Sequence, residues 1–291
     1  MQKKIVLGVV GLMCAALTAR AGWEYVSVTK AEGGKHAEMA NASVHAIVDG
    51  SKAKIEFTES KNPMMGTGNY LLTSDAGKTA YLVNPGEKLY SKWDMNAMLG
   101  MAGGMMGMMN MKIKDQKAEK LLEEKGPAIL GQPTTHYKFR TSYTMEINFM
   151  GMKQSTTTAN EEELWVTTAL KDDALTFAAM RKEMKTGNAD LDKLIADQMN
   201  KAQGFPLKVI TKNSTTDSNG NAQESTVMME VTTLKKVSPG ADVFAMPKGY
   251  TEQDLNPLAA LMGGGQKAGG GKKGGDNPLL KMLQEQMKQQ Q

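Results

Sequence analysis

A dense run of methionines is the part of the sequence whose residue types suggest chemistry most directly. Eight methionines fall within the seventeen residues from 95 to 111, namely Met95, Met98, Met101, Met105, Met106, Met108, Met109 and Met111. A thioether sulfur is a soft ligand that suits Cu(I), so a copper site is one interpretation of the run. The three histidines, His36, His45 and His136, lie elsewhere in the chain, so the run has no imidazole ligand of its own.

Two other interpretations of this run need no metal. Methionine side chains are unbranched and adaptable, so they can cover an apolar groove of variable shape. Alternatively, Gly100, Gly103, Gly104 and Gly107 recur at helical spacing and leave a broad methionine face that packs on a sheet or a membrane surface. We favour the groove cover and expect no bound metal or cofactor. Its contact residues would be Met95, Met98, Met101, Met105, Met106, Met108 and Met109.

The chain has no residue pattern typical of an enzyme active site. It contains no Gly-x-Ser-x-Gly elbow, no His-Glu-x-x-His motif, no phosphate-binding loop and no EF-hand spacing. Two acidic clusters, Asp172-Asp173 and Glu161-Glu162-Glu163, are more typical of helix caps and dipole partners than of a general acid and base. We therefore expect a protein that is not an enzyme.

The N-terminal residues have the pattern of a secretory signal peptide. Lys3 and Lys4 precede an apolar stretch from Ile5 to Leu17, and Ala19-Arg20-Ala21 is a small-x-small cleavage site. We expect residues 1–21 to be removed and the protein to be periplasmic or secreted. The apolar stretch is too short to span a bilayer and no later run is long enough, so no transmembrane segment is expected after cleavage.

Cysteine and charge narrow the function classes further. The single cysteine, Cys14, lies inside the predicted leader without a lipoprotein pattern before it, so the mature chain has no thiol or disulfide. The leader also carries three of the 35 basic residues, which leaves 32 against 31 acidic ones. A nearly neutral chain with 5% aromatic residues is not typical of a nucleic-acid-binding protein.

Alternating apolar and polar residues predict β-strands over most of the chain. Six short strands are expected first, at Glu24–Thr29, Ser43–Val48, Ala53–Thr58, Asn69–Thr73, Thr79–Val83 and Lys88–Lys92. Asp49-Gly50, Asp75–Gly77 and Asn84-Pro85-Gly86 between them are typical of hairpin turns. Further strands are expected at Thr135–Asn148, Glu162–Thr167, Leu207–Lys212, Ser225–Lys235 and Val243–Ala245.

The apolar period changes to three and four between Thr167 and Phe205. Two helices are expected there, separated near Thr186-Gly187-Asn188, in a helical insertion at about residues 168–204. Gly204 and Pro206 are expected to end the second helix.

The chain after residue 250 has a composition typical of disorder. Residues 251–291 are rich in glycine, lysine and glutamine and cannot bury enough apolar area to offset their ordering entropy. Two segments beginning Asn-Pro-Leu, at Asn256 and Asn277, can each form a short amphipathic helix on contact with a partner. Their partner-binding residues would be Leu258, Leu261, Leu279, Leu280 and Leu283.

The order of the strand motifs resembles a family of secreted bacterial proteins. Tyr81-Leu82-Val83-Asn84-Pro85 followed by Lys88-Leu89-Tyr90 is similar to a hairpin of proteins related to the LolA and LolB lipoprotein carriers. Ile129-Leu130-Gly131, Glu163–Val166, Met229–Leu234 and Val243–Tyr250 continue the series, and the family that it resembles is domain of unknown function 4412, from about Trp23 to Tyr250. The resemblance implies an α+β fold, mainly antiparallel β, with a curved half-barrel sheet and helices packed on its concave side.

These observations together predict an exported, non-catalytic binding protein. Residues 22–250 would form the domain, with the methionine- and glycine-rich insertion at 95–111, and an apolar groove would hold a lipid, an acyl chain or a hydrophobic partner segment. The alternatives are a methionine-rich Cu(I)-binding periplasmic protein and a cell-envelope interaction module that uses its C-terminal Asn-Pro-Leu segments.

Overall fold

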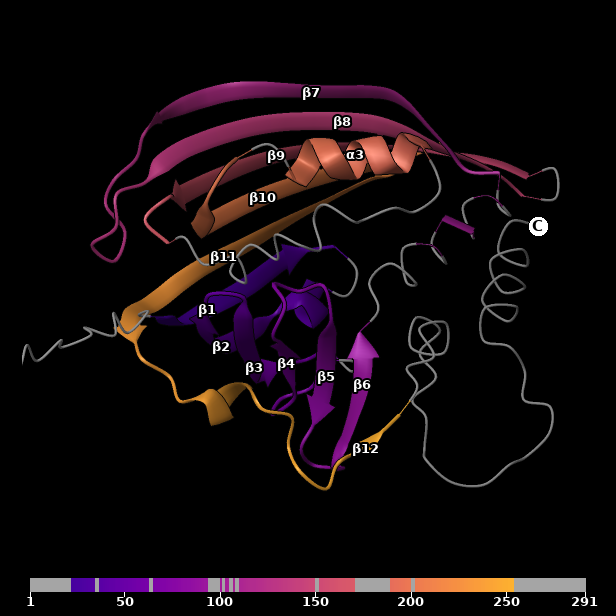
Figure 1. Cartoon of the computed structure of the whole chain (residues 1–291). Coiled ribbons are helices and arrows are strands. Elements are labelled where there is room, and N and C mark those ends of the chain that lie inside the picture. The colour runs from indigo at the N-terminus through magenta and orange to yellow at the C-terminus, as the bar shows by residue number, and fades with distance from the viewer. Residues whose placement is uncertain are drawn as a thin grey trace, which may run out of the picture.

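Strands dominate the part of the chain that the structure describes (Figure 1). This computed structural model describes residues 22–34, 37–62, 65–93, 100, 103–104, 107, 110–149, 152–170, 189–199 and 202–253.

The six strands predicted in the N-terminal part of the chain are confirmed. They are β1 (Gly22–Gly33), β2 (Ala42–Asp49), β3 (Lys52–Ser60), β4 (Tyr70–Thr73), β5 (Ala80–Asn84) and β6 (Leu89–Trp93). The predicted turns lie between them, and Gly50 and Gly77 have φ values of 61° and 86°. Glycine adopts such positive φ values without a steric penalty, so these positions set the places where the chain reverses.

Five longer strands follow and arch across the upper part of Figure 1. They are β7 (Lys112–Lys125), β8 (Thr135–Phe149), β9 (Met152–Thr167), β10 (Phe205–Asp217) and β11 (Ala222–Val237). The sequence did not predict β7, and it predicted only the last third of β9. Both segments are polar, and β9 is rich in threonine, whose branched Cβ favours the extended backbone.

All of these strands join in one open sheet of twelve strands. The order is β12-β6-β5-β4-β3-β2-β1-β11-β10-β9-β8-β7, where β12 is Thr251–Glu252. Neighbouring strands are antiparallel except β12 and β6, which run parallel. Strand β1 therefore joins a meander of short strands to a meander of long strands.

The predicted fold class, a half-barrel sheet with helices on its concave side, is wrong, because the structure has one open sheet. Among the described residues no helix packs on the concave side of the sheet: the α-helix α3 (Ala189–Met199) contacts the edge strand β7. Gln116 of β7 donates a hydrogen bond to the Asp190 carbonyl oxygen at 3.4 Å. Helix α3 corresponds to the second predicted helix, whereas the first lies outside the described residues. The fold is mainly an antiparallel open sheet, and its core forms from strand side chains together with Leu170, which follows β9.

The hydrophobic core lies on one face of the sheet, which we call the inner face. It contains Trp23, Tyr25, Ala46, Val48, Ala53, Leu170, Phe205, Leu207 and Val231. On β1 and β2 the core residues alternate along the strand. They also pair across strands, since Trp23 lies opposite Val48 and Val48 lies opposite Ala53. A strand places alternate residues on one face, so the period of two explains why these side chains gather on the inner face.

A C-terminal segment covers part of the opposite face, which we call the outer face. The 3-10 helix η3 (Ala241–Phe244) contacts β3, and the Phe244 ring is buried with the Lys52 ammonium 5.9 Å from its centre. Val243–Ala245 was predicted as a strand, and this prediction is wrong. The segment then reaches β6, where the Thr251 N–H donates to the Lys88 carbonyl at 3.0 Å.

Candidate functional site

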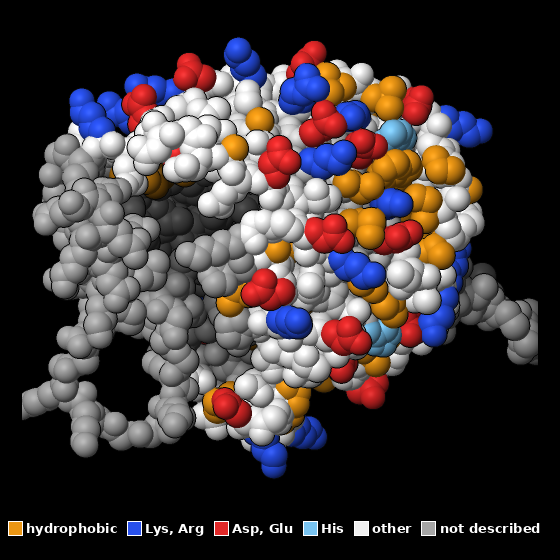
Figure 2. Space-filling view, turned by 180° about the vertical axis from the view of Figure 1, so that it is seen from behind, with side chains coloured by type: hydrophobic (Ala, Val, Ile, Leu, Met, Phe, Trp, Pro, Cys, Tyr) orange, Lys and Arg blue, Asp and Glu red, His pale blue; other side chains and the backbone are white. Residues whose placement is uncertain are grey.

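The outer face of the long strands carries a ladder of opposite charges. Lys138 lies 2.7 Å from one Glu161 carboxylate oxygen, and Arg140 lies 3.2 Å from the other. The hydrogen bond from Lys138, followed by that from Arg140, lowers the pKa of Glu161. Figure 2 shows this side of the molecule, with acidic and basic side chains interspersed. Such a mixed charged surface is typical of a sheet face that meets water.

The acidic cluster Glu161-Glu162-Glu163 is part of this sheet. It was predicted to cap a helix, but all three residues lie within β9, so that prediction is wrong. Alternation places Glu161 and Glu163 on the outer face, opposite Arg140 and Lys138 of β8. The cluster thus serves cross-strand ion pairs, and Asp172-Asp173 lies outside the described residues.

Two of the three histidines also lie on the outer face, far apart along the sheet. His45 Nε2 lies 2.9 Å from the Glu24 carboxylate, and this contact is the main cause that lowers the pKa of Glu24. The His136 ring stacks on Trp165 with 4.4 Å between ring centres. Within the described ranges no group of three or more His, Cys, Asp or Glu side chains is placed to hold a metal ion.

The inner face of β8 to β11 changes from apolar to polar along the strands. Nearest the core, cross-strand pairing brings Tyr137, Leu164, Val209 and Met229 into one row. The next row holds Phe139, Glu162, Thr211 and Val227, and the third holds Thr141, Asn160, Asn213 and Ser225. Rows on one face are about 7 Å apart, so the surface changes character over roughly 14 Å.

The first of these rows extends the core without being fully buried. Tyr137, Leu164, Val209 and Met229 are each half-buried, whereas Leu207 and Val231 beside them are buried. Tyr137 stacks on Phe139 of the same strand, with 5.8 Å between ring centres. An apolar strip with aromatic rings therefore borders the core, and we call these four residues the apolar row.

A chain of hydrogen bonds runs from Thr215, one row further along, to the two asparagines of the third row. The Thr215 hydroxyl donates to Asn213 Oδ1 at 2.9 Å, and Asn213 Nδ2 donates to Asn160 Oδ1 at 2.5 Å. Thr141 lies opposite Asn160 on β8, and its side-chain hydroxyl is buried without a hydrogen-bond partner in the described part of the chain. The polar end of this face thus has an amide hydrogen bond between β9 and β10.

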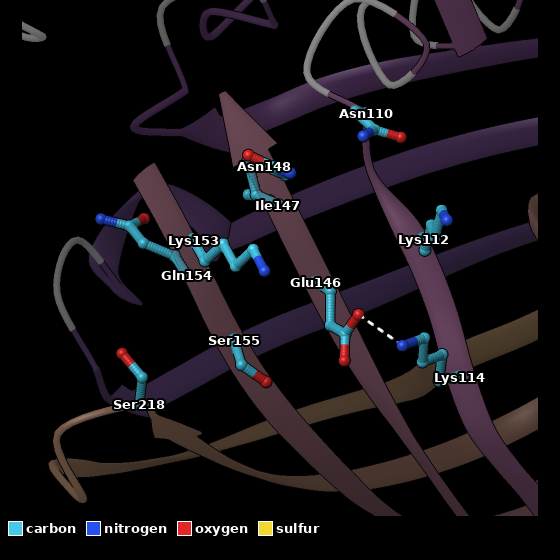
Figure 3. Close-up of a pocket in the computed structure, with 10 residues that line it drawn as sticks. All are labelled: Asn110, Lys112, Lys114, Glu146, Ile147, Asn148, Lys153, Gln154, Ser155 and Ser218. Carbon is cyan, nitrogen blue, oxygen red and sulfur yellow. Dashed lines mark ion pairs between the residues drawn. The ribbon is translucent and has the colours of Figure 1, made fainter. Parts of the chain in front are cut away.

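A pocket lies where β7 begins, β8 ends and β9 begins. It has a volume of about 480 Å³ and also reaches the turn between β10 and β11. Figure 3 shows its lining residues, which are Asn110, Lys112, Lys114, Glu146, Ile147, Asn148, Lys153, Gln154, Ser155 and Ser218. Lys114 and Glu146 point toward one another across β7 and β8 and form an ion pair of 2.6 Å. We call this the strand-end pocket.

The site residues predicted from the sequence lie outside the described residues. These are the methionines of the groove cover from Met95 to Met109 and the leucines of the two Asn-Pro-Leu segments. The groove cover, the copper site and the partner-binding tail therefore stay predictions. Sequence reasoning did not find the strand-end pocket, because its lysines come from β7, which was not predicted, and from the unpredicted start of β9.

Comparison with known families gives one match. The sequence model of the family described as Domain of unknown function (DUF4412) matches residues 35–250, and the match ends at the residue that the resemblance predicts. A comparison with curated proteins finds none that matches the chain. Among the described residues, no helix is both long and apolar enough to cross a membrane.

Proposed function

We infer the function of this chain from its structure and from its membership of the family Domain of unknown function (DUF4412). We propose that it is an exported, non-catalytic protein that binds an apolar ligand on the inner face of β8 to β11. The ligand would be a lipid, an acyl chain or a hydrophobic segment of a partner. Its apolar part would lie against the apolar row, next to the core.

The apolar row is the observation that carries this proposal. Four large side chains from four adjacent strands lie side by side, and all four are only half-buried. Ligand sites are typically lined by hydrophobic and aromatic side chains with a few polar groups that fix orientation. The hydrogen-bonded row of Asn160 and Asn213 supplies such groups about 14 Å along the same face.

We also propose a relationship to the LolA and LolB carriers. A single long antiparallel sheet and the order of the strand motifs support it. Helices on the concave side are not part of this proposal, because the described helix α3 contacts the edge strand instead.

Two adjacent residues of β10 provide a matched test. Val209 belongs to the apolar row and Ile210 faces the outer surface, and both are half-buried. A tryptophan at either position adds the same bulk to the same strand, but only Val209→Trp fills the proposed ligand surface. A fluorescent acyl probe is titrated into the purified chain and into each variant.

We expect Val209→Trp to weaken probe binding about tenfold or more, equivalent to about 1.4 kcal/mol, and Ile210→Trp to leave it nearly unchanged. Solvent extraction of the purified chain followed by mass spectrometry should also release a lipid. If no lipid is extracted and the unchanged chain binds no probe, the proposal is wrong. Equal losses in the two variants would place the probe elsewhere and would also reject it.

A further inference from the structure

We propose that the strand-end pocket binds a phosphate group. This inference does not depend on the apolar ligand, because the pocket opens at the strand ends and uses different residues. It contains residues of both faces: Ile147 and Gln154 pair with one another on the inner face, and Glu146 pairs with Lys112 on the outer face. The pocket therefore wraps around the end of the sheet (Figure 3).

The charge of the pocket is the first argument. Three lysines, Lys112, Lys114 and Lys153, line it together with a single carboxylate, that of Glu146. Glu146 is already paired with Lys114 at 2.6 Å. Within the part of the chain that is described, no carboxylate forms an ion pair with Lys112 or Lys153. Two positive charges thus remain for a ligand, which matches the charge of about −2 on a phosphate monoester at neutral pH.

The neighbouring acidic residue accepts hydrogen bonds within its own turn, and no ion pair joins it to the pocket lysines among the described residues. Asp217 precedes the pocket residue Ser218, but its carboxylate serves its own turn. It accepts hydrogen bonds from the Asn219 and Asn221 N–H groups at 2.8 and 2.9 Å and from Asn221 Nδ2 at 2.9 Å. The bond from the Asn221 side chain is the main cause that lowers the pKa of Asp217.

Neutral hydrogen-bonding groups complete the pocket. Asn148 and Ser155, which pair with Lys153 and Glu146 on the outer face, contribute a side-chain amide and a hydroxyl group, and Asn110 and Ser218 also line the pocket. In Figure 3, Lys153 extends from β9 toward β8, on the side where Glu146 and Lys114 meet. Lysine binds phosphate as a point charge, and amide and hydroxyl donors can satisfy the remaining phosphate oxygens. The volume of about 480 Å³ leaves room for the group that carries the phosphate.

Such a phosphate can belong to a lipid headgroup or to a free compound, and two probes distinguish them. Inorganic phosphate is titrated into the full chain by calorimetry. In parallel, the chain is sedimented with phosphatidylcholine vesicles that contain or lack phosphatidylglycerol. Both measurements are made at low ionic strength, because salt screens contacts of exposed charges.

The decisive variant is Lys112→Gln with Lys153→Gln. Lys30→Gln with Lys92→Gln is its control, since it removes the same charge from exposed strand positions outside the pocket. We expect the pocket variant to weaken binding about tenfold or more while the control changes it by less than about twofold. All four lysines are exposed, so circular dichroism should show folded protein in each case.

A variant that is expected to strengthen phosphate binding provides a second test. Glu146→Gln removes the one acidic side chain of the pocket and frees Lys114, so we expect tighter binding, whereas Glu32→Gln on β1 should have little effect. Loss of phosphate binding in the pocket variant supports a site for free phosphate compounds. Loss of vesicle binding alone supports a headgroup site. If neither probe binds, or if the control loses binding equally, the proposal is overturned.

Discussion

The rings of Tyr25 on β1 and Phe205 on β10 lie with their centres 5.2 Å apart, although β11 runs between these two strands. Adjacent strands are about 4.8 Å apart, so strands separated by a third are about 9.6 Å apart. The two rings meet over β11 because both are large and both face inward. This contact ties the short-stranded and long-stranded halves of the sheet together within the core.

Truncation to alanine should lower the free energy of unfolding much more at a buried leucine than at an exposed one. Leu207 has no exposed surface, whereas Leu130 is 40% exposed. Leu207→Ala should lower the free energy of unfolding by about 2 to 5 kcal/mol, because it removes apolar contacts and leaves a cavity. Leu130→Ala should change it by less than about 0.5 kcal/mol. Urea denaturation measures both, and similar losses would contradict the assignment of the core.

The strand pattern was predictable where each strand has one apolar face and one polar face. Val44 and Ala46 alternate with Ser43 and His45, and Asp49-Gly50 follows Val48 as a turn, so β2 could be predicted from the sequence. Strand β7 could not, because its exposed edge position permits the sequence KIKDQKAEKLLEEK, which has no period of two. Charged residues on an edge strand discourage pairing with other chains, so their presence is physically reasonable there.

The candidate sites were less predictable than the strands, for a related reason. The apolar row depends on the cross-strand register of Tyr137, Leu164 and Val209, which are far apart in the sequence. The strand-end pocket joins Lys112 and Lys153 through the pairing of β7, β8 and β9. Sequence periodicity gives the face on which a residue lies, but it does not give its neighbours on other strands.

The buried hydroxyl of Tyr25 predicts a loss of stability at alkaline pH. Burial raises its pKa from 10.0 to about 12. Because the folded-state pKa is raised, the contribution of Tyr25 to stability is complete below pH 10 and is lost as the pH rises through about 12. A shift of this size corresponds to about 2 to 3 kcal/mol.

The variant Tyr25→Phe tests this assignment. Its stability at pH 7 should be close to that of the unchanged chain, and it should lose less stability between pH 10 and 12. Denaturation curves across this range provide the measurement. Parallel curves for the two proteins would show that Tyr25 is not the residue responsible.

The contribution of the Glu161 carboxylate to stability should have the opposite pH dependence, with a loss in acid. Hydrogen bonds from Lys138 and Arg140 lower its pKa from the ordinary value of 4.5. A lowered folded-state pKa gives stability that is present above pH 4.5 and is lost as the pH falls through the folded value. Glu161→Gln should therefore be less stable than the unchanged chain at pH 7, and the difference should shrink steadily as the pH falls below 4.5. Glu87→Gln, in an exposed turn, serves as the control, and a gap that persists in acid would reject this explanation.

Two buried threonines should respond oppositely to replacement by valine. The Thr134 hydroxyl donates a hydrogen bond to the Pro127 carbonyl at 2.6 Å, whereas the Thr141 hydroxyl has no partner among the described residues. Valine has nearly the same shape but no hydroxyl. Thr134→Val should lower the free energy of unfolding by about 1 kcal/mol, and Thr141→Val should leave it unchanged or raise it by about 1 kcal/mol. Thermal unfolding of both variants decides the matter, and a clear loss in Thr141→Val would reveal a partner for its hydroxyl.

Two glycines with positive φ values allow the cost of backbone strain to be measured separately from the cost of steric overlap. Gly204 has φ of 116° and precedes β10, and Gly131 has φ of 75° in the turn before β8. A Cβ atom at Gly204 would lie 2.5 Å from the Thr167 carbonyl oxygen and 2.9 Å from Val166 Cγ1, whereas one at Gly131 would meet nothing within 4 Å. Gly131→Ala should cost about 1 kcal/mol through strain alone. Gly204→Ala should cost about 1 to 3 kcal/mol more, because the end of β9 must shift to admit the methyl group. Chemical denaturation of the two variants measures this difference. Equal costs would mean that a Cβ atom at Gly204 has more space than the 2.5 Å distance to the Thr167 carbonyl oxygen implies.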